Sequence, residues 1–168
     1  MSQERIDLII PVRAGSKGIL NKNLSEINGI SLVERSFNML KACKLIDNII
    51  ISTDSSEIKL IFEKEKNVII HDRPKILASD KASTESVVEY VIHKIKNLNE
   101  FLGFYQVTNQ FLKSEDIDGS IKMLIENKYN SLFTSYKCHS FIWEKKNFSF
   151  ERVNHSPLKK RKRRQEIK

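Results

Sequence analysis

Apolar runs alternate along this chain with segments in which apolar residues recur at helical spacing. The apolar runs predict β-strands at residues 7–12, 48–53, 67–71 and 101–107. Strands and helices that alternate in this way are typical of βαβ units, and consecutive Val and Ile residues suit parallel strands covered on both faces. We therefore expect an α/β three-layer sandwich with a mostly parallel, Rossmann-like sheet. Ligands of such sheets bind at the carboxyl ends of the strands. The loops of interest are then 12–30, 52–56, 72–84 and 107–114.

The helical segments begin near side chains that can cap a helix. Ser31 and Glu34 have the spacing of a capping box, which predicts a helix from Ser31 to Cys43. The same reasoning predicts three further helices: the first capped by Asp54 with Glu57, the second capped by Ser83 or Thr84, and the third preceded by Ser114.

Composition narrows the class of protein. The chain has 168 residues, of which 40% are hydrophobic and 30% charged, as in one globular domain. No apolar run approaches the ~20 residues of a membrane span, and the N-terminus lacks the features of a signal peptide, so we expect a cytoplasmic protein. Cys43 and Cys138 lie far apart in the sequence, and the histidines show no metal-ligand spacing. We therefore expect no disulfide and no metal ligands, and we expect both cysteines to be buried.

Positive charge is concentrated at one end of the chain. The formal net charge is +8, but the run KKRKRR at 159–164 carries six of these charges, so the remainder is nearly balanced at +2. This run contains no interleaved aromatic residue and belongs to no recognition motif. It can act as a nuclear import signal only in a eukaryotic host. We expect no specific nucleic-acid partner, only salt-sensitive affinity for polyanions.

The loop after the first strand is rich in cations and glycine. The sequence IIPVRAGSKGILNKN at 9–23 matches neither a Walker A motif nor a dinucleotide-binding fingerprint. Gly15 and Gly18 nevertheless permit backbone conformations that direct successive N–H groups at one anion. The cations that can add charge-assisted hydrogen bonds are Arg13, Lys17 and Lys22. On this pattern alone, a phosphate-binding loop and a solvated basic turn both remain open.

A wider resemblance favours phosphate binding. The loop resembles the signature I-P-A-R-x-G-S-K-G-I-P-x-K-N of the CMP-sialic acid synthetases, the acylneuraminate cytidylyltransferases. Further segments resemble later motifs of that family in the same order: IIISTDSSEI at 49–58, RPKILASDKAST at 73–84, YQVTNQFLKSEDI at 105–117 and RRQ at 163–165. The resemblance covers nearly the whole chain. It implies the nucleotide-diphospho-sugar transferase type of α/β fold and the reaction of CTP with a nine-carbon acidic sugar to give the CMP-sugar and pyrophosphate.

The resemblance also implies which residues form the site. Arg13 and Lys22 match positions on the triphosphate and are the expected catalytic residues, because charge accumulates on phosphate oxygens in this reaction. The expected nucleotide-binding residues are Arg13, Ala14, Gly15, Ser16, Lys17, Lys22, Asn23, Arg73, Ala82, Ser83 and Thr84. The expected sugar-binding residues are Gln106, Arg164 and Gln165. For Asp54 and Asp80 we expect a structural role, as a cap or turn residue.

Cofactor, partner and domain expectations follow from the same resemblance. It implies Mg²⁺ and a homodimer formed through an arm. We expect a nucleotidyltransferase core at 1–136, a dimerisation arm or hairpin at 137–158 and a basic tail at 159–168. Family members continue past the R-Q pair to an Asp-x-Asp pair that binds the metal, whereas this sequence ends at Lys168. A fragment, a truncated gene and an inactive relative that retains nucleotide binding are the alternatives, and we expect impaired turnover.

Two departures from the family pattern affect the expected site. Leu20 stands in place of the loop proline, which would fix one backbone angle. Residues 107–112 replace P-T-S-P-L-R and lose its arginine, for which Lys113 can substitute only if the loop shifts. The sugar is therefore open among the N-acylneuraminates and the related legionaminate, pseudaminate and 3-deoxy-manno-octulosonate, although LASDKAST favours the first two.

Overall fold

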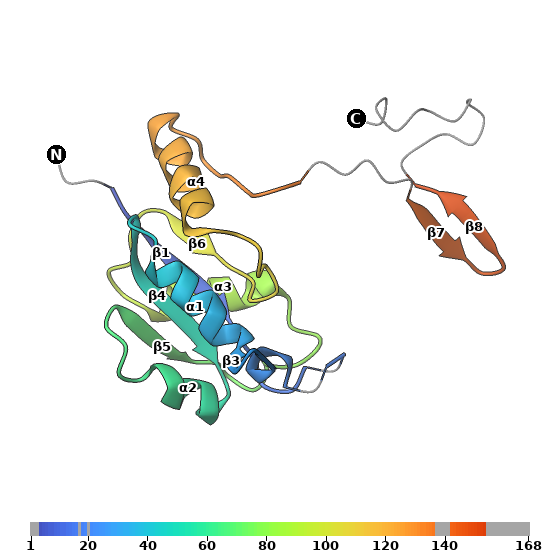
Figure 1. Ribbon diagram of the computed structural model, residues 1–168, viewed down its shortest axis with the longest axis horizontal. Helices are drawn as coiled ribbons and strands as arrows, with labels where there is room; N and C mark the ends of the chain where they lie inside the picture. The colour runs from blue at the N-terminus through green and yellow to red at the C-terminus, as the bar shows by residue number, and fades with distance from the viewer. Residues whose placement is uncertain (1–3, 17, 20, 137–141, 154–168) are drawn as a thin grey trace. The chain divides into compact units, whose positions relative to one another are not determined.

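The computed structural model describes residues 4–16, 18–19, 21–136 and 142–153 (Figure 1). The chain divides into two compact units, Met1–Leu132 and Phe133–Lys168, which are described separately below. Among the described helices, none has the length and apolar character needed to cross a membrane.

A parallel sheet forms the centre of the first unit. Its four strands are β1 (Ile6–Pro11), β4 (Ile46–Thr53), β5 (Val68–Asp72) and β6 (Leu102–Phe104), in the order β5-β4-β1-β6. The parallel pairings confirm the expected sheet. The fourth strand is shorter than expected at 101–107, because the backbone turns away from the sheet where the Asn109 N–H donates to the Gln106 carbonyl at 2.9 Å.

Helices cover both faces of this sheet. They are α1 (Leu32–Lys41), α2 (Ser56–Phe62), α3 (Thr84–Lys94) and α4 (Ser114–Glu126). Leu8 and Ile10 of β1 belong to the core formed with α1, α2 and α4, whereas Ile9 between them packs with Val91 of α3. The alternation along β1 thus separates two helical layers, with α1 and α3 on opposite faces (Figure 1). This arrangement confirms the expected three-layer sandwich.

The helix caps agree with the sequence in two cases and differ in one. Ser31 and Glu34 form the expected capping box, and the Ser83 hydroxyl caps α3 by accepting from the Ser86 N–H at 3.1 Å. The expected cap Asp54 is wrong: the Ser55 hydroxyl caps α2. Asp54 is unavailable because its carboxylate accepts a hydrogen bond from the Ala14 N–H at 2.8 Å. The helix expected after Ser114 is present, but Ser114 is its first residue and Lys113 takes the N-cap position.

Two short elements follow the first loop. A 3₁₀ turn, η1 (Lys22–Leu24), leads into a small hairpin of β2 (Glu26–Ile27) and β3 (Ile30–Ser31). Asn28 and Gly29 both have positive φ, at 54° and 75°, as a two-residue hairpin turn requires. The hairpin returns the chain to the start of α1, where the Leu32 N–H donates to the Ser25 carbonyl at 3.1 Å.

The second unit contains an antiparallel hairpin of β7 (Trp143–Lys146) and β8 (Ser149–Arg152). The Arg152 guanidinium lies 5.0 Å from the centre of the Trp143 ring, and the Lys146 ammonium pairs with the Glu151 carboxylate at 2.8 Å. These cross-strand contacts stabilise the pairing. The hairpin lies within the segment 137–158, and its use as a dimerisation arm stays a prediction.

Candidate functional site

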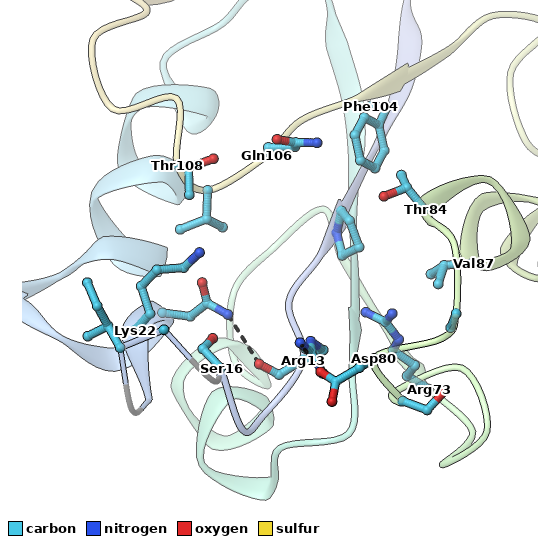
Figure 2. A pocket seen from close by; sticks show the side chains of 17 residues that line it. Arg13, Ser16, Lys22, Arg73, Asp80, Thr84, Val87, Phe104, Gln106 and Thr108 are labelled. Atoms are coloured by element: carbon cyan, nitrogen blue, oxygen red, sulfur yellow. Dashed lines mark hydrogen bonds and ion pairs between the residues drawn. The ribbon is translucent and has the colours of Figure 1, made fainter. Parts of the chain in front are cut away.

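A pocket of about 580 Å³ opens at the carboxyl ends of β1 and β6 (Figure 2). These strands are neighbours in the sheet, and α/β proteins bind ligands at the carboxyl ends of their parallel strands. The volume suits a small molecule. Three segments line the pocket: Pro11, Arg13, Ser16, Gly18, Ile19, Lys22 and Asn23 from the first; Arg73, Ser79, Asp80, Ala82, Thr84 and Val87 from the second; and Phe104, Gln106, Val107 and Thr108 from the third.

The structure brings most of the expected site residues to this pocket. Those that line it are Arg13, Ser16, Lys22, Asn23, Arg73, Ala82, Thr84 and Gln106. Ala14, Gly15 and Ser83 belong to the same loops but do not line it. Lys17, Arg164 and Gln165 lie outside the described residues, as does Leu20. Residues from three distant parts of the sequence therefore share one cavity, and their roles in binding are taken up below.

Local backbone geometry shapes the first wall of the pocket. Gly15 has a φ of 67°, a left-handed conformation that costs glycine little and other residues more. The Asn23 side-chain amide donates to the Arg13 carbonyl at 3.1 Å and so closes the loop on itself. Lys22 is the first residue of η1, and it is half-buried where it lines the pocket. The internal bond from Asn23 and the hydrogen bond from the Ala14 N–H to the Asp54 carboxylate position the loop at the pocket.

Arg13 connects the first wall to the second. One terminal nitrogen of its guanidinium donates to the Ala78 carbonyl at 3.1 Å, and the other pairs with the Asp80 carboxylate at 2.8 Å (Figure 2). Both side chains are partly exposed, at 29% for Arg13 and 41% for Asp80. The structural role expected for Asp80 is thus an ion pair with the residue that we expected to bind phosphate.

Arg73 supplies a second guanidinium on the facing loop. Its Nε and one terminal nitrogen both donate to the Leu77 carbonyl, at 2.8 and 2.5 Å, so that the side chain is positioned by its own turn. Burial lowers the pKa of Arg73, the positive charge of Arg13 lowers it further, and Asp54 opposes both effects. Arginine nevertheless stays charged at neutral pH. The guanidinium groups of Arg13 and Arg73 thus place two positive charges on neighbouring walls of the pocket.

The charge of the pocket suits an anion. Its described lining contains three cations, Arg13, Lys22 and Arg73, and one carboxylate, Asp80. Converging guanidinium and ammonium groups form charge-assisted hydrogen bonds with phosphate and raise the local concentration of anions. The arrangement can therefore bind a phosphorylated ligand of several negative charges.

The divergent segment 107–112 folds against α1. The Gln110 side-chain amide donates to the Ser36 hydroxyl at 2.8 Å and to the Leu32 carbonyl at 3.2 Å, and Val107 is buried. Lys113 precedes α4 and does not line the pocket, so the substitution for the missing arginine is not seen. The side of the pocket next to Gln106 is thus formed by Phe104 and Thr108.

Sequence reasoning missed several residues of the lining. They are Pro11, Ile19, Ser79, Val87, Phe104, Val107 and Thr108. Phe104 could have been found as the last residue of a strand at the ligand-binding edge. Val87 carried no such signal, because its apolar position on α3 predicts core packing, and it is fully buried. The lining therefore includes core side chains as well as loop residues.

The solved structures similar to this chain define its class of fold. A synthetase for CMP-2-keto-3-deoxy-manno-octonic acid, complexed with CTP, has a TM-score of 0.60 and 16% identity over 75% of this chain and 49% of its own. The 2-C-methyl-D-erythritol 4-phosphate cytidylyltransferase of Francisella tularensis has a TM-score of 0.64 and 12% identity over 92% and 68%. This chain shares its fold with these two enzymes.

The sequence places the chain within this class. The profile of the cytidylyltransferase family matches residues 8–166, and the chain belongs to that family. It is 42% identical over 74 residues to post-translational flagellin modification protein B of Campylobacter coli, an alignment that covers 44% of this chain and 32% of the relative. It is 36% identical over 74 residues to the CMP-N,N'-diacetyllegionaminic acid synthase of Campylobacter jejuni, with coverage of 44% and 32%. It is 30% identical over 121 residues to the N-acylneuraminate cytidylyltransferase of Escherichia coli, with coverage of 71% and 28%. These alignments span about a third of each relative's length.

Proposed function

We propose that this chain binds CTP in the pocket at the ends of β1 and β6 and serves in the transfer of CMP to an acidic sugar. The observation that carries the proposal is the convergence of Arg13, Lys22 and Arg73 on one cavity at the carboxyl ends of the strands of a cytidylyltransferase fold. Three cations match the several negative charges of a nucleoside triphosphate. A solvated basic turn, the alternative for the first loop, would not require cations from two loops to face the same cavity.

The geometry supports a division of roles within the pocket. Arg13 and Lys22, with Ser16, Asn23 and backbone groups of residues 14–16, bind the triphosphate. Arg73 and the segment Ala82–Thr84 hold the cytosine and ribose. The sugar hydroxyl attacks the α-phosphorus from the side of Gln106, and pyrophosphate leaves. Arg13 and Lys22 stabilise the charge that develops on the phosphate oxygens, which is the main catalytic need of this reaction.

The substrate we propose is a nine-carbon acidic sugar of the sialic or legionaminic type. The names of two relatives, an N-acylneuraminate cytidylyltransferase and a diacetyllegionaminic acid synthase, support this choice. Val107 and Thr108 of the divergent segment line the pocket beside Gln106, and we propose that they contact the sugar. We further propose that the chain works as a homodimer in the cytoplasm, where CTP is available.

A magnesium ion is implied by the family resemblance, and the described residues do not by themselves form a site that fits it. Protein-bound Mg²⁺ usually takes one or two carboxylates together with substrate phosphates. In the part of the chain that the structure describes, no three His, Cys, Asp or Glu side chains are grouped to hold a metal. Asp80 is the one carboxylate of the described pocket lining, and it pairs with Arg13. We therefore derive no catalytic step through a metal.

Titration calorimetry with CTP, ATP and GTP tests the proposal. The protein is titrated with each nucleotide in turn, in the same buffer with Mg²⁺. We expect selective binding of CTP, because the 73–84 segment would form hydrogen bonds with the edge of a pyrimidine base. The 13–23 loop would bind the triphosphate of any nucleotide equally well. Equal affinities for the three nucleotides would refute the cytidylyl assignment and leave a general triphosphate site.

A further inference from the structure

Asp80 places a carboxylate inside a pocket that otherwise attracts anions. It lines the same cavity as the three cations and pairs with Arg13 at 2.8 Å. A triphosphate next to Asp80 would be repelled by it, and the low dielectric of a partly enclosed pocket strengthens that repulsion. Asp80 and the phosphates therefore compete for the same guanidinium.

The hydrogen-bonding capacity of Arg13 shows what such an exchange would involve. A guanidinium has five N–H donors, and it binds phosphate most strongly when two of them act in parallel. In this structure one terminal nitrogen donates to the Ala78 carbonyl and the other to Asp80. If a phosphate replaces Asp80, Arg13 keeps its bond to the Ala78 carbonyl, so its orientation is preserved while its ionic partner changes.

The loop that carries Asp80 also carries the residues proposed to hold the nucleoside. Its turns are internal: the Leu77 N–H donates to the Pro74 carbonyl at 2.9 Å and the Ala82 N–H to the Ser79 carbonyl at 3.3 Å. Asp80 lies within the second of these turns, two residues from Ala82. A displacement of Asp80 that involves its backbone therefore also moves Ala82, one of the residues proposed to hold the cytosine and ribose.

We propose that Asp80 occupies the phosphate position on Arg13 when no nucleotide is bound and that the incoming triphosphate displaces it. This displacement moves the 79–82 turn and so couples phosphate binding to recognition of the nucleoside. The inference deepens the proposed function and rests on it. Asp80 is then a positioning residue that lowers the affinity for triphosphate. It makes the backbone conformation of the 79–82 turn depend on whether phosphate is bound.

The test compares the Asp80→Asn variant with the parent protein by titration with inorganic triphosphate and with CTP. Asparagine keeps the shape of the side chain and removes its charge. We expect Asp80→Asn to bind both ligands about fivefold more tightly, the upper range for one partly exposed ion pair. The matched control is Asp72→Asn, which removes an exposed carboxylate next to Arg73 that pairs with Lys59 rather than with Arg13. The control is expected to change the affinity less than about twofold.

Two further measurements separate exchange on Arg13 from a general charge effect. In an Arg13→Ala background, Asp80→Asn should no longer strengthen the binding of inorganic triphosphate, because the competed group is gone. Inorganic triphosphate should also increase amide hydrogen exchange in residues 78–82 of the parent protein and not of Asp80→Asn.

Each outcome of these experiments decides the matter. Unchanged or weaker binding by Asp80→Asn overturns the exchange, as does an equal gain in the Arg13→Ala background. Selective CTP binding without the gain in Asp80→Asn refutes the exchange alone and leaves the proposed function intact. A gain seen with inorganic triphosphate in a protein that does not prefer CTP supports the exchange and refutes the proposed function.

Discussion

The Asp7→Ala substitution is expected to destabilise the first unit strongly, because the residue lies on a central strand of the sheet. Asp7 is a fully buried carboxylate on β1. It accepts hydrogen bonds from the Asn48 backbone N–H at 3.2 Å, the Asn48 side-chain amide at 2.8 Å and the Asn99 N–H at 2.7 Å. It thus connects the start of β4 to the chain that enters β6.

The size of the loss follows from these three bonds. A hydrogen bond to a charged group contributes about 1.5–3 kcal/mol, and a buried donor left without a partner costs about 1–3 kcal/mol. Asn48 and Asn99 are only half-buried, so water can satisfy part of what the alanine removes. We therefore expect a total loss of about 2–4 kcal/mol, below the sum of three such bonds. At a urea m-value of ~2 kcal/mol per M, the midpoint falls by about 1–2 M.

Urea denaturation monitored by circular dichroism measures this loss. The control is Asp47→Ala, which removes a neighbouring carboxylate that is 46% exposed and lies 3.7 Å from Arg5. Exposed pairs of this kind contribute roughly 0–1 kcal/mol. A loss in Asp7→Ala below about 1 kcal/mol, or no larger than that of the control, would show that the buried carboxylate does not hold the sheet as the hydrogen bonds indicate.

Two further predictions concern buried titratable groups. Burial lowers the pKa of His71, whose Nδ1 lies 3.0 Å from the Ser52 hydroxyl, so the unfolded chain takes up a proton more readily than the folded one. The free energy of unfolding should therefore fall as the pH drops below ~6.5, which urea midpoints measured between pH 8 and 5.5 should show. The His71→Gln variant should show a smaller fall, and an equal fall in both proteins would contradict the assignment. Burial, aided by Asp118 and Glu115, raises the pKa of Cys43 to about 12, so iodoacetamide at pH 8 should label it only after unfolding, as peptide mass spectrometry can measure; complete labelling in the native protein within minutes would refute this.

Much of the fold could be predicted from local pattern, because the apolar runs and the helix caps that mark these elements lie within short stretches of sequence. The apolar runs gave β1, β4 and β5 to within two residues at each end, and Ser31 with Glu34 gave the start of α1. The hairpin of β2 and β3 also had a local signal, the Asn28-Gly29 pair. It was missed because strands of two residues are too short to show alternation.

The contacts that shape the pocket could not be read in this way. Asp54 was a plausible helix cap by position, and only the folded chain shows that its carboxylate is used by Ala14, 40 residues away. Arg13 likewise meets Ala78 across 65 residues of sequence. Long-range partners depend on how the strands are ordered in the sheet, which periodicity does not specify. The family motifs indicated which loops form the site but not the ion pair between them.

The Arg13→Ala variant provides the most direct test of the central claim that this pocket binds the triphosphate of CTP. Arg13 follows β1 and faces the pocket, whereas Arg5 precedes the same strand at its other end, which makes Arg5→Ala a matched control. In calorimetric titration with CTP, we predict that Arg13→Ala weakens binding tenfold or more, from the loss of about 1.5–3 kcal/mol of charge-assisted hydrogen bonding, while Arg5→Ala binds as the parent does. Equal affinities of both folded variants would contradict the account.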